Sequence, residues 1–292
     1  MTRIVTQRDF DRFAALSRDD NPIHCDPVFA RGTHFGATVA HGMFLYGMIC
    51  GAITRRFDAP WLPLTQTLMF PAPTFAGDAT AVRLAAREPP GAFDVGIEVE
   101  RDGCQVGTAS GEGVVLGAPF AAAPGAPGAP GAPGAPEPVG ERDGESTGGR
   151  DGEGEPLSGL VPGRRAKTTR RFEPGDLDEY ADLCADPNPL VVDAAAARRA
   201  GLPERVVPAP LLSGMFSDLL GTRLPGPGTG WMKQSLRFLK PAHPGQALQA
   251  MVEVVRVRPD KQLVNLRSTV RDLSGVLLVD GEALVLVRDL AR

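Results

Sequence analysis

The sequence predicts an α+β protein built from two similar halves, each with one buried helix enclosed by an antiparallel sheet. Three observations lead to this prediction. The phrase Asp-x-Asn-Pro occurs twice, beginning at Asp19 and at Asp186; a long apolar helix pattern follows each copy; and β-like segments follow each helix pattern. One helix followed by several antiparallel strands is typical of α+β architecture.

The two halves align as a tandem repeat. Four residues around each phrase and a Gly-Met pair further on align at one constant offset, and the offset drifts slightly after that. The aligned residues of the first half are Asp19, Asn21, Pro22, Asp26 and Gly47, and those of the second half are Asp186, Asn188, Pro189, Asp193 and Gly214. We therefore expect a duplicated chain whose halves fold alike.

Composition changes abruptly after Leu116. Segment 117–163 holds Gly-Ala-Pro repeats and then a Gly/Glu/Asp/Arg stretch, and it has almost no aliphatic side chains. Such a segment cannot bury a core. We expect a flexible linker spanning about 40 Å, between a first domain at 1–116 and a second at 164–292.

The first half contains two helix patterns. Apolar residues at helical spacing predict a helix over 9–17 with Thr6 as its cap, and Pro22 is expected to end helical geometry. A second helix is expected over about 40–53; because it is apolar on nearly every face, it must be enclosed on nearly every face. Turn signals at 89–91 and 101–103 separate the β-like runs, which are 67–70, 79–86, 93–100 and 105–116.

The second half repeats this layout. Its strands are expected near 231–239, 247–257, 262–271 and 276–287. A sheet curled round one apolar helix is a hotdog unit, so the chain is predicted to be a double hotdog, a pseudo-dimer within one polypeptide. Association of whole chains into a further homodimer is left open.

Charge and cysteine content exclude several classes of protein. The formal net charge is −4 and no basic stripe dominates a long segment, which argues against a nucleic-acid partner. The four cysteines are widely spaced and form no C-x-x-C pair, so we expect reduced thiols and a cytoplasmic protein. The most apolar run, from Thr38, is short and glycine-rich and contains His41, which predicts a buried helix and no membrane span.

The first copy of the phrase carries an acid and a base. Asp19 and His24 flank Asn21 and Pro22 at the point where the first helix has ended and the chain turns. A carboxylate and an imidazole in one pocket can share a water and exchange protons near neutral pH. This pair suits addition or loss of water across a carbon–carbon double bond. No metal is expected, because this loop lacks the converging ligands of a zinc site.

His41 and Gly42 open the apolar helix of the first half. Backbone N–H groups at a helix start are unpaired and lie at the positive end of the helix dipole. A thioester carbonyl on the Gly42 N–H would have its developing enolate charge stabilised there. We expect Gly42 to serve as oxyanion and substrate-binding residue, and His41 to hydrogen-bond the helix start beside it.

The segment SRDDNPIHCDPVFA, followed by VAHGMF, resembles the signature of the MaoC-like dehydratases, also called hydratase 2 or (R)-specific enoyl-CoA hydratases. The resemblance covers both halves and leaves out the linker. It implies Asp19 and His24 as the catalytic pair, Asn21 as the motif asparagine and Gly42 as the motif glycine. The implied reaction interconverts trans-2-enoyl and (3R)-3-hydroxyacyl thioesters, with CoA or phosphopantetheine as part of the substrate and no further cofactor.

Two positions depart from the family pattern. Single-domain members commonly have a serine on the enclosed helix near the active site; the resemblance puts Cys50 there, and Ser217 is the aligned residue of the second half. Cys50 is therefore expected to support the site, with an effect on substrate fit or rate. The glycine that precedes the motif aspartate is Arg18 in this chain.

The second copy of the phrase has lost its chemistry. Val191 stands where His24 stands in the first copy, and the His-Gly-Met segment has become Val-Pro-Ala-Pro around Pro208. Asp186 and Asn188 are then expected to hold a turn. We expect the second half to shape the substrate pocket through strand 231–238, whose Lys233 and Arg237 are candidate phosphate contacts.

Two other functions stay open from the sequence. A dehydratase, isomerase or cyclase acting on a carrier-bound polyketide-type chain would keep the fold and change the reaction. A non-catalytic acyl-thioester binding partner would need neither His24 nor Gly42. The acyl chain length, the choice of CoA or carrier protein, and the pathway stay open from the sequence.

Overall fold

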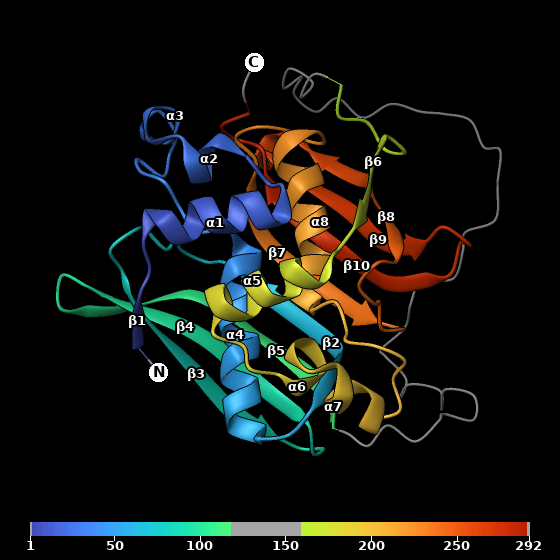
Figure 1. Ribbon diagram of the computed structural model, residues 1–292. Helices are drawn as coiled ribbons and strands as arrows, with labels where there is room; N and C mark the ends of the chain where they lie inside the picture. The colour runs from blue at the N-terminus through green and yellow to red at the C-terminus, as the bar shows by residue number, and fades with distance from the viewer. Residues whose placement is uncertain (1, 118–158, 291–292) are drawn as a thin grey trace.

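The computed structural model describes residues 2–117 and 159–290. Within them, ten antiparallel strands form one continuous sheet in the order β1-β3-β4-β5-β2-β7-β10-β9-β8-β6. The sheet curls round two central helices, α4 and α8 (Figure 1). This arrangement confirms the predicted α+β double hotdog. The predicted linker, apart from its first residue and its last five, lies outside the described residues.

The first half begins with a short strand and a capped helix. The Thr6 side chain accepts a hydrogen bond from the Asp9 N–H, and the Asp9 carboxylate accepts one from the Thr6 N–H, which confirms the predicted cap. The elements are β1 (Thr2–Ile4), α1 (Gln7–Ser17), α2 (Pro22–Cys25), α3 (Pro27–Arg31), α4 (Gly42–Phe57), β2 (Trp61–Met69), β3 (Ala79–Arg87), β4 (Ala92–Arg101) and β5 (Cys104–Gly117).

The second half repeats this order. Its elements are β6 (Arg165–Arg171), α5 (Pro174–Cys184), α6 (Pro189–Val192), α7 (Ala194–Arg199), α8 (Ala209–Thr222), β7 (Gly230–Phe238), β8 (Ala247–Arg258), the 3-10 helix η1 (Pro259–Lys261), β9 (Leu263–Asp272) and β10 (Leu277–Leu286). Antiparallel pairing of β2 with β7, from Thr65 opposite Arg237 to Met69 opposite Lys233, joins the two halves into one sheet. The internal pseudo-dimer is therefore held together by main-chain hydrogen bonds.

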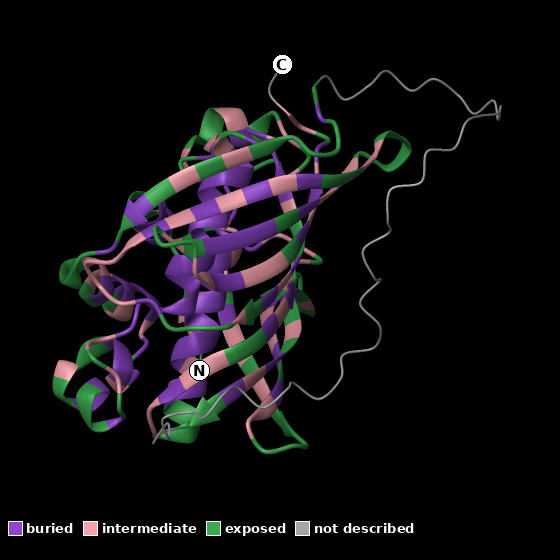
Figure 2. Cartoon of the chain, turned by 90° about the vertical axis from the view of Figure 1, so that its right-hand side faces the viewer, coloured by how far each residue is buried: buried purple, intermediate pink, exposed green. Residues whose placement is uncertain are grey.

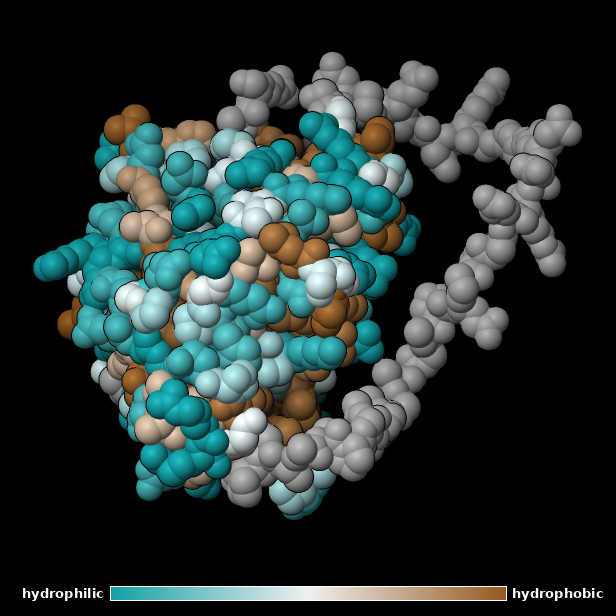
Figure 3. All heavy atoms as spheres, turned by 45° about the vertical axis from the view of Figure 1, so that its right-hand side comes forward, coloured by the Kyte–Doolittle hydropathy of each residue, from teal (hydrophilic) through white to brown (hydrophobic). Residues whose placement is uncertain are grey.

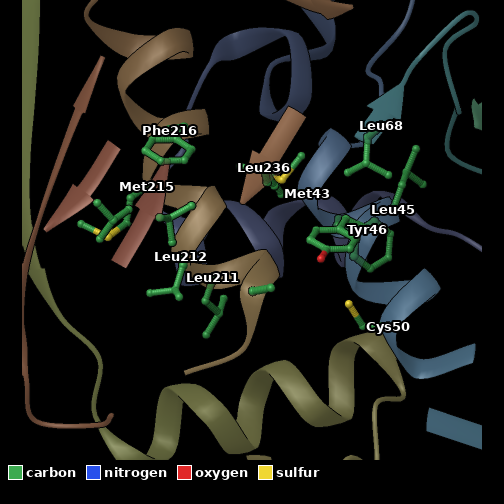
Figure 4. Packing of buried hydrophobic residues seen from close by; sticks show 14 of the residues in the cluster. Met43, Leu45, Tyr46, Cys50, Leu68, Leu211, Leu212, Met215, Phe216 and Leu236 are labelled. Carbon is green, nitrogen blue, oxygen red and sulfur yellow. The ribbon is translucent and has the colours of Figure 1, made fainter. Parts of the chain in front are cut away.

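The core lies between the concave face of the sheet and the two central helices. Both helices are buried along most of their length (Figure 2), as the apolar pattern of the first one predicts. They also pack against each other, and the cluster between them includes Met43, Tyr46, Leu211, Leu212 and Met215 (Figure 4). In the part of the chain that the structure describes, no helix is long and apolar enough to cross a membrane.

The face of the molecule in Figure 3 is mostly hydrophilic, with hydrophobic side chains gathered in places. Exposed large hydrophobic residues include Leu64, Leu116 and Leu239. All three line a cavity described below.

Candidate active site

The loop that carries the first Asp-x-Asn-Pro phrase connects two helices. Helix α1 ends at Ser17, and Arg18 adopts the left-handed conformation with φ of 64°. Asn21 then caps the short helix α2, in which Pro22 takes a first-turn position. The Asn21 N–H donates to Asp19 Oδ1 at 3.2 Å, so the turn itself holds the aspartate side chain.

Asn21 also ties this loop to the second half. Its amide Nδ2 donates to the Thr229 carbonyl at 3.2 Å, and its Oδ1 accepts from the Gly228 N–H at 3.1 Å. The motif asparagine therefore positions Asp19 against residues that lie more than two hundred positions away in the chain.

The structure brings Asp19 and His24 together in a buried site. His24 Nε2 lies 3.9 Å from Asp19 Oδ2, and the two residues are 7% and 1% exposed. His24 Nδ1 donates to the Val39 carbonyl at 2.7 Å, which leaves Nε2 without a proton in the neutral ring. Burial lowers the pKa of His24 below its ordinary value, although the Asp19 charge and the Val39 carbonyl oppose this. A neutral His24 thus presents a proton acceptor toward Asp19.

His41 supports the same loop. Its Nε2 donates to the Asp19 carbonyl at 2.9 Å, and its ring stacks on the His24 ring with centroids 3.7 Å apart. Burial and then the neighbouring His24 lower the pKa of His41 well below its ordinary value. A neutral His41 therefore holds the loop of the catalytic pair in place. The prediction that His41 hydrogen-bonds the helix start is wrong, because its side chain makes no capping bond to α4 and is directed to the Asp19 carbonyl instead.

Ser217 completes the site from the opposite half. Its hydroxyl, on α8, donates a hydrogen bond to Asp19 Oδ2. Cys50, the predicted supporting residue, does not lie at this site: it is on α4, one turn beyond Tyr46 (Figure 4). It lines a second cavity, which Asp186 also lines. The placement of Cys50 is corrected because each central helix turns its later residues toward the loop of the other half.

A cavity of about 410 Å³ surrounds these groups. Gly42, the first residue of α4, lines it beside Asp19 and His24, and a Cβ there would lie 2.7 Å from the Phe70 ring. The Gly42 N–H has no acceptor inside its helix. Both halves contribute to the wall, and the residues from the second half are Ser217, Leu220, Gly221, Thr229, Gly230, Trp231, Met232 and Leu286.

The predicted strand 231–238 contributes its first two residues to this wall. Lys233 and Arg237, the candidate phosphate contacts, are absent from the described lining of the cavity, and Arg237 forms an exposed ion pair with Asp280. Within the predicted strand, Trp231 and Met232 are therefore the residues that line the pocket.

Asp19, His24 and His41 offer three potential ligand atoms within 4.8 Å of one another. The two imidazole rings are stacked, so the lone pairs in their planes run side by side and do not converge on one point. This geometry does not fit the tetrahedral cage of a zinc site, and the expectation of a metal-free reaction stays a prediction.

The aligned loop of the second half holds its aspartate differently. Asp186 accepts hydrogen bonds from Thr54 Oγ1 at 2.7 Å and from the Tyr180 hydroxyl at 3.0 Å. Burial raises the pKa of Asp186 despite these bonds. Val191 replaces the histidine, and Pro208 precedes the first residue of α8. The predicted role of Asp186 in holding a turn agrees with its acceptance of the Asn188 N–H at 3.2 Å.

A buried acid and imidazole beside a free helix N-terminus define a site for acid–base chemistry on a bound carbonyl compound. A family model described as the MaoC like domain matches residues 1–101 and 159–275. The chain belongs to this family of MaoC-like dehydratases, and it is a hydro-lyase.

Two curated relatives match about half of the chain each. An (R)-specific enoyl-CoA hydratase of Aeromonas caviae is 37% identical over 126 residues, which is 43% of this chain and 94% of the relative. An (R)-specific enoyl-CoA hydratase of Rhodospirillum rubrum is 34% identical over 128 residues, 44% of this chain and 88% of the relative.

Solved structures share the fold over the whole chain. A MaoC-like dehydratase superimposes with a TM-score of 0.71 at 17% identity, covering 98% of this chain and 95% of that one. A Mycobacterium tuberculosis protein described as having a double hotdog fold superimposes with a TM-score of 0.67 at 15% identity, covering 98% and 93%. Both likenesses support the double hotdog.

Proposed function

We propose that the protein interconverts trans-2-enoyl thioesters and (3R)-3-hydroxyacyl thioesters by reversible addition of water. The observation that carries this proposal is the buried pair of His24 Nε2 and Asp19 Oδ2, 3.9 Å apart at the wall of a cavity. Two acceptors at that separation can both reach one water molecule within hydrogen-bond distance. The water would then lie between the catalytic pair and the substrate.

In the proposed reaction, the catalytic pair accepts one proton and gives up one proton. In hydration, the pair takes a proton from the water as its oxygen bonds to C3, and the pair delivers a proton to C2. The pair therefore ends in its starting protonation state, and dehydration runs the same steps in reverse. Because Asp19 and His24 interact closely and titrate together, we assign the proton transfers to the pair as a unit.

Gly42 has a separate proposed role. Negative charge develops on the thioester oxygen when the C2 proton joins or leaves, and an N–H at the start of α4 can stabilise it. The loss of one such donor costs about 3 kcal/mol in other enzymes. The Phe70 ring lies where the Cβ of any other residue at position 42 would be, so the position requires glycine unless the ring moves.

The names of the curated relatives support the substrate class. The two hydratases above are named for enoyl-CoA and for R specificity. A mitochondrial relative from Arabidopsis thaliana, 29% identical over 134 residues, is named 3-hydroxyacyl-[acyl-carrier-protein] dehydratase. CoA and carrier protein present the same phosphopantetheine thioester, so we propose this thioester as the recognised group.

The test is hydration of crotonyl-CoA, followed by loss of the absorbance of the conjugated thioester. We expect Asp19→Asn and His24→Gln each to lower kcat by about a hundredfold or more, because each removes a proton-transfer group. Asp26→Asn and His243→Gln are the matched controls, since neither residue lines the cavity, and both should retain wild-type rates. Equal activity of all four variants would refute the assignment of the pair, and a carrier-linked crotonyl substrate would identify a preference for carrier protein.

A further inference from the structure

We propose that the second cavity is a non-catalytic binding site for an acyl chain with an anionic head group. This cavity has a volume of about 390 Å³, close to that of the candidate active site. Among the described residues, the two cavities share no lining residue. The second cavity is therefore a separate site and no extension of the first.

The second cavity has kept its space while losing the imidazole of the first. Val191 replaces His24, and Ala209, the first residue of α8, stands where Gly42 stands in the first half. Protein interiors are close-packed, and an empty cavity is destabilising. A volume that persists after the chemistry has gone indicates that the cavity has a use of its own.

The lining favours an apolar chain. Trp61, Leu62, Val206, Val207 and Leu212 form much of the wall. At the rim, large hydrophobic side chains remain in contact with solvent: Leu64, Leu116 and Leu239 are 39%, 46% and 47% exposed. An apolar cavity with an exposed apolar rim is suited to a ligand that enters with its hydrocarbon part first.

The charged residues of the second cavity indicate where the anionic head group would lie. Among the described residues that line this cavity, Lys240 is the one cation, and it is exposed. Asp186, the acid of the lining, is buried, and its two carboxylate oxygens accept hydrogen bonds from Thr54 and Tyr180. The tail would lie beside the apolar wall, and an anionic head would meet Lys240 at the rim. A fatty acid carboxylate and the phosphates of a fatty acyl-CoA both have this chemistry.

The test localises a bound chain directly and does not depend on enzyme activity. Dodecanoic acid with a terminal diazirine is photo-crosslinked to the full chain, and labelled peptides are mapped by mass spectrometry. We expect saturable labelling within 201–212 and 61–64. Labelling confined to peptides 34–42 and 70–75, which line the other cavity, or no saturable labelling, would overturn the proposal.

Affinity measurements by calorimetry test the chain and the head group. Dodecanoate should bind about fifteenfold more tightly than decanoate, since each buried methylene contributes about fourfold. Ala209→Leu should weaken binding about tenfold by filling the cavity, whereas Ala195→Leu on the exposed side of α7 should not. Affinity that is independent of chain length and of Ala209→Leu would contradict the proposal.

Lys240→Glu should weaken dodecanoate binding about threefold and leave dodecanol binding unchanged, with exposed Lys261→Glu as control. Thermal melts establish that each variant is folded.

Competition with excess dodecanoyl-CoA in the labelling experiment separates the two sources of the ligand. Protection of 201–212 from labelling would assign the thioester, and persistent labelling would assign the free acid.

Discussion

Asp19 and Asp186 occupy aligned positions, yet different side chains reach their carboxylates. Thr54 and Tyr180 both donate to Asp186, while Ser217 donates to Asp19. In the repeat, Gly221 aligns with Thr54 and Phe13 aligns with Tyr180, so two donors present in the second site have no counterpart in the first. A Cβ at Gly221 would lie 2.7 Å from Asp19 Oδ1. The candidate active site therefore depends on small or apolar residues as much as on the acid and base.

Replacement of Ser217 by alanine tests the contact across the halves. The hydroxyl donates to the Asp19 oxygen that faces His24, and a hydrogen bond to a charged group contributes about 1.5–3 kcal/mol. We expect Ser217→Ala to lower kcat about ten- to a hundredfold with a smaller effect on KM. Ser213→Ala, one turn earlier on the same helix, removes a buried hydroxyl bound to its own helix and should change kcat little. Equal kcat values for the two variants would contradict this role.

The two stacked histidines should make stability depend on pH. Burial lowers the pKa of both His24 and His41 in the folded protein, so below pH 6.5 the unfolded chain binds more protons than the folded one. The free energy of unfolding should therefore fall as the pH drops from 7.5 to 5.5, by at most about 1.4 kcal/mol per pH unit for each proton. Urea denaturation across this range should show a shallower slope for His41→Gln. An unchanged slope would refute the contribution of His41.

Helices and strands that have a strong apolar pattern of their own were predictable from the sequence. The central helix of the first half was predicted over 40–53 and lies at Gly42–Phe57, and seven of the eight predicted strands match observed strands to within one residue at each end. Strand β2 was predicted over 67–70 but begins at Trp61, because its first part contains Pro63 and a bulge. The edge strands β1 and β6 were missed, since their pairing with β3 and β8 forms them without an apolar pattern.

The candidate site was predictable only as far as it is local in sequence. One loop places Asp19, Asn21 and His24 together, and the start of α4 follows closely. Ser217 and Cys50 could not be assigned to their sites by alignment. The alignment of the repeat shows that the two positions are equivalent, but it does not show which central helix packs against which loop. That choice depends on the packing of α4 against α8.

The turn between α1 and α2 offers a test at the scale of an element. Arg18 holds φ of 64°, a conformation that costs a residue with a side chain about 1 kcal/mol relative to glycine. We expect Arg18→Gly to raise the free energy of unfolding by up to about 1 kcal/mol. Arg8→Gly, an exposed helical position of α1, should lower it by about the same amount. Urea denaturation of both variants measures this difference, and destabilisation by Arg18→Gly would show that the arginine side chain contributes more than the strain costs.

For the whole molecule, the duplication allows the two halves to differ. Asn21 contacts the loop at Gly228 and Thr229, β2 pairs with β7, and α8 supplies Ser217. The candidate active site is thus made by both halves, while the acid and base come from one of them. If the two halves were identical, each of the two sites between them would contain the same residues.

This asymmetry predicts how the first half behaves alone. Fragment 1–117 contains Asp19, His24 and Gly42, and a pair of such fragments would set Cys50 and Thr54 against each Asp19, where the whole chain has Ser217 and Gly221. The threonine hydroxyl would bind the Asp19 carboxylate as it binds Asp186 in the whole chain, and the buried thiol is a weak donor. We expect the fragment to be at least about tenfold less active than the whole chain on crotonyl-CoA, and co-expression with fragment 159–292 to restore activity. Cys50→Ser combined with Thr54→Gly should raise the activity of fragment 1–117 by itself. Full activity of the unmodified fragment would show that the second half is dispensable for the reaction.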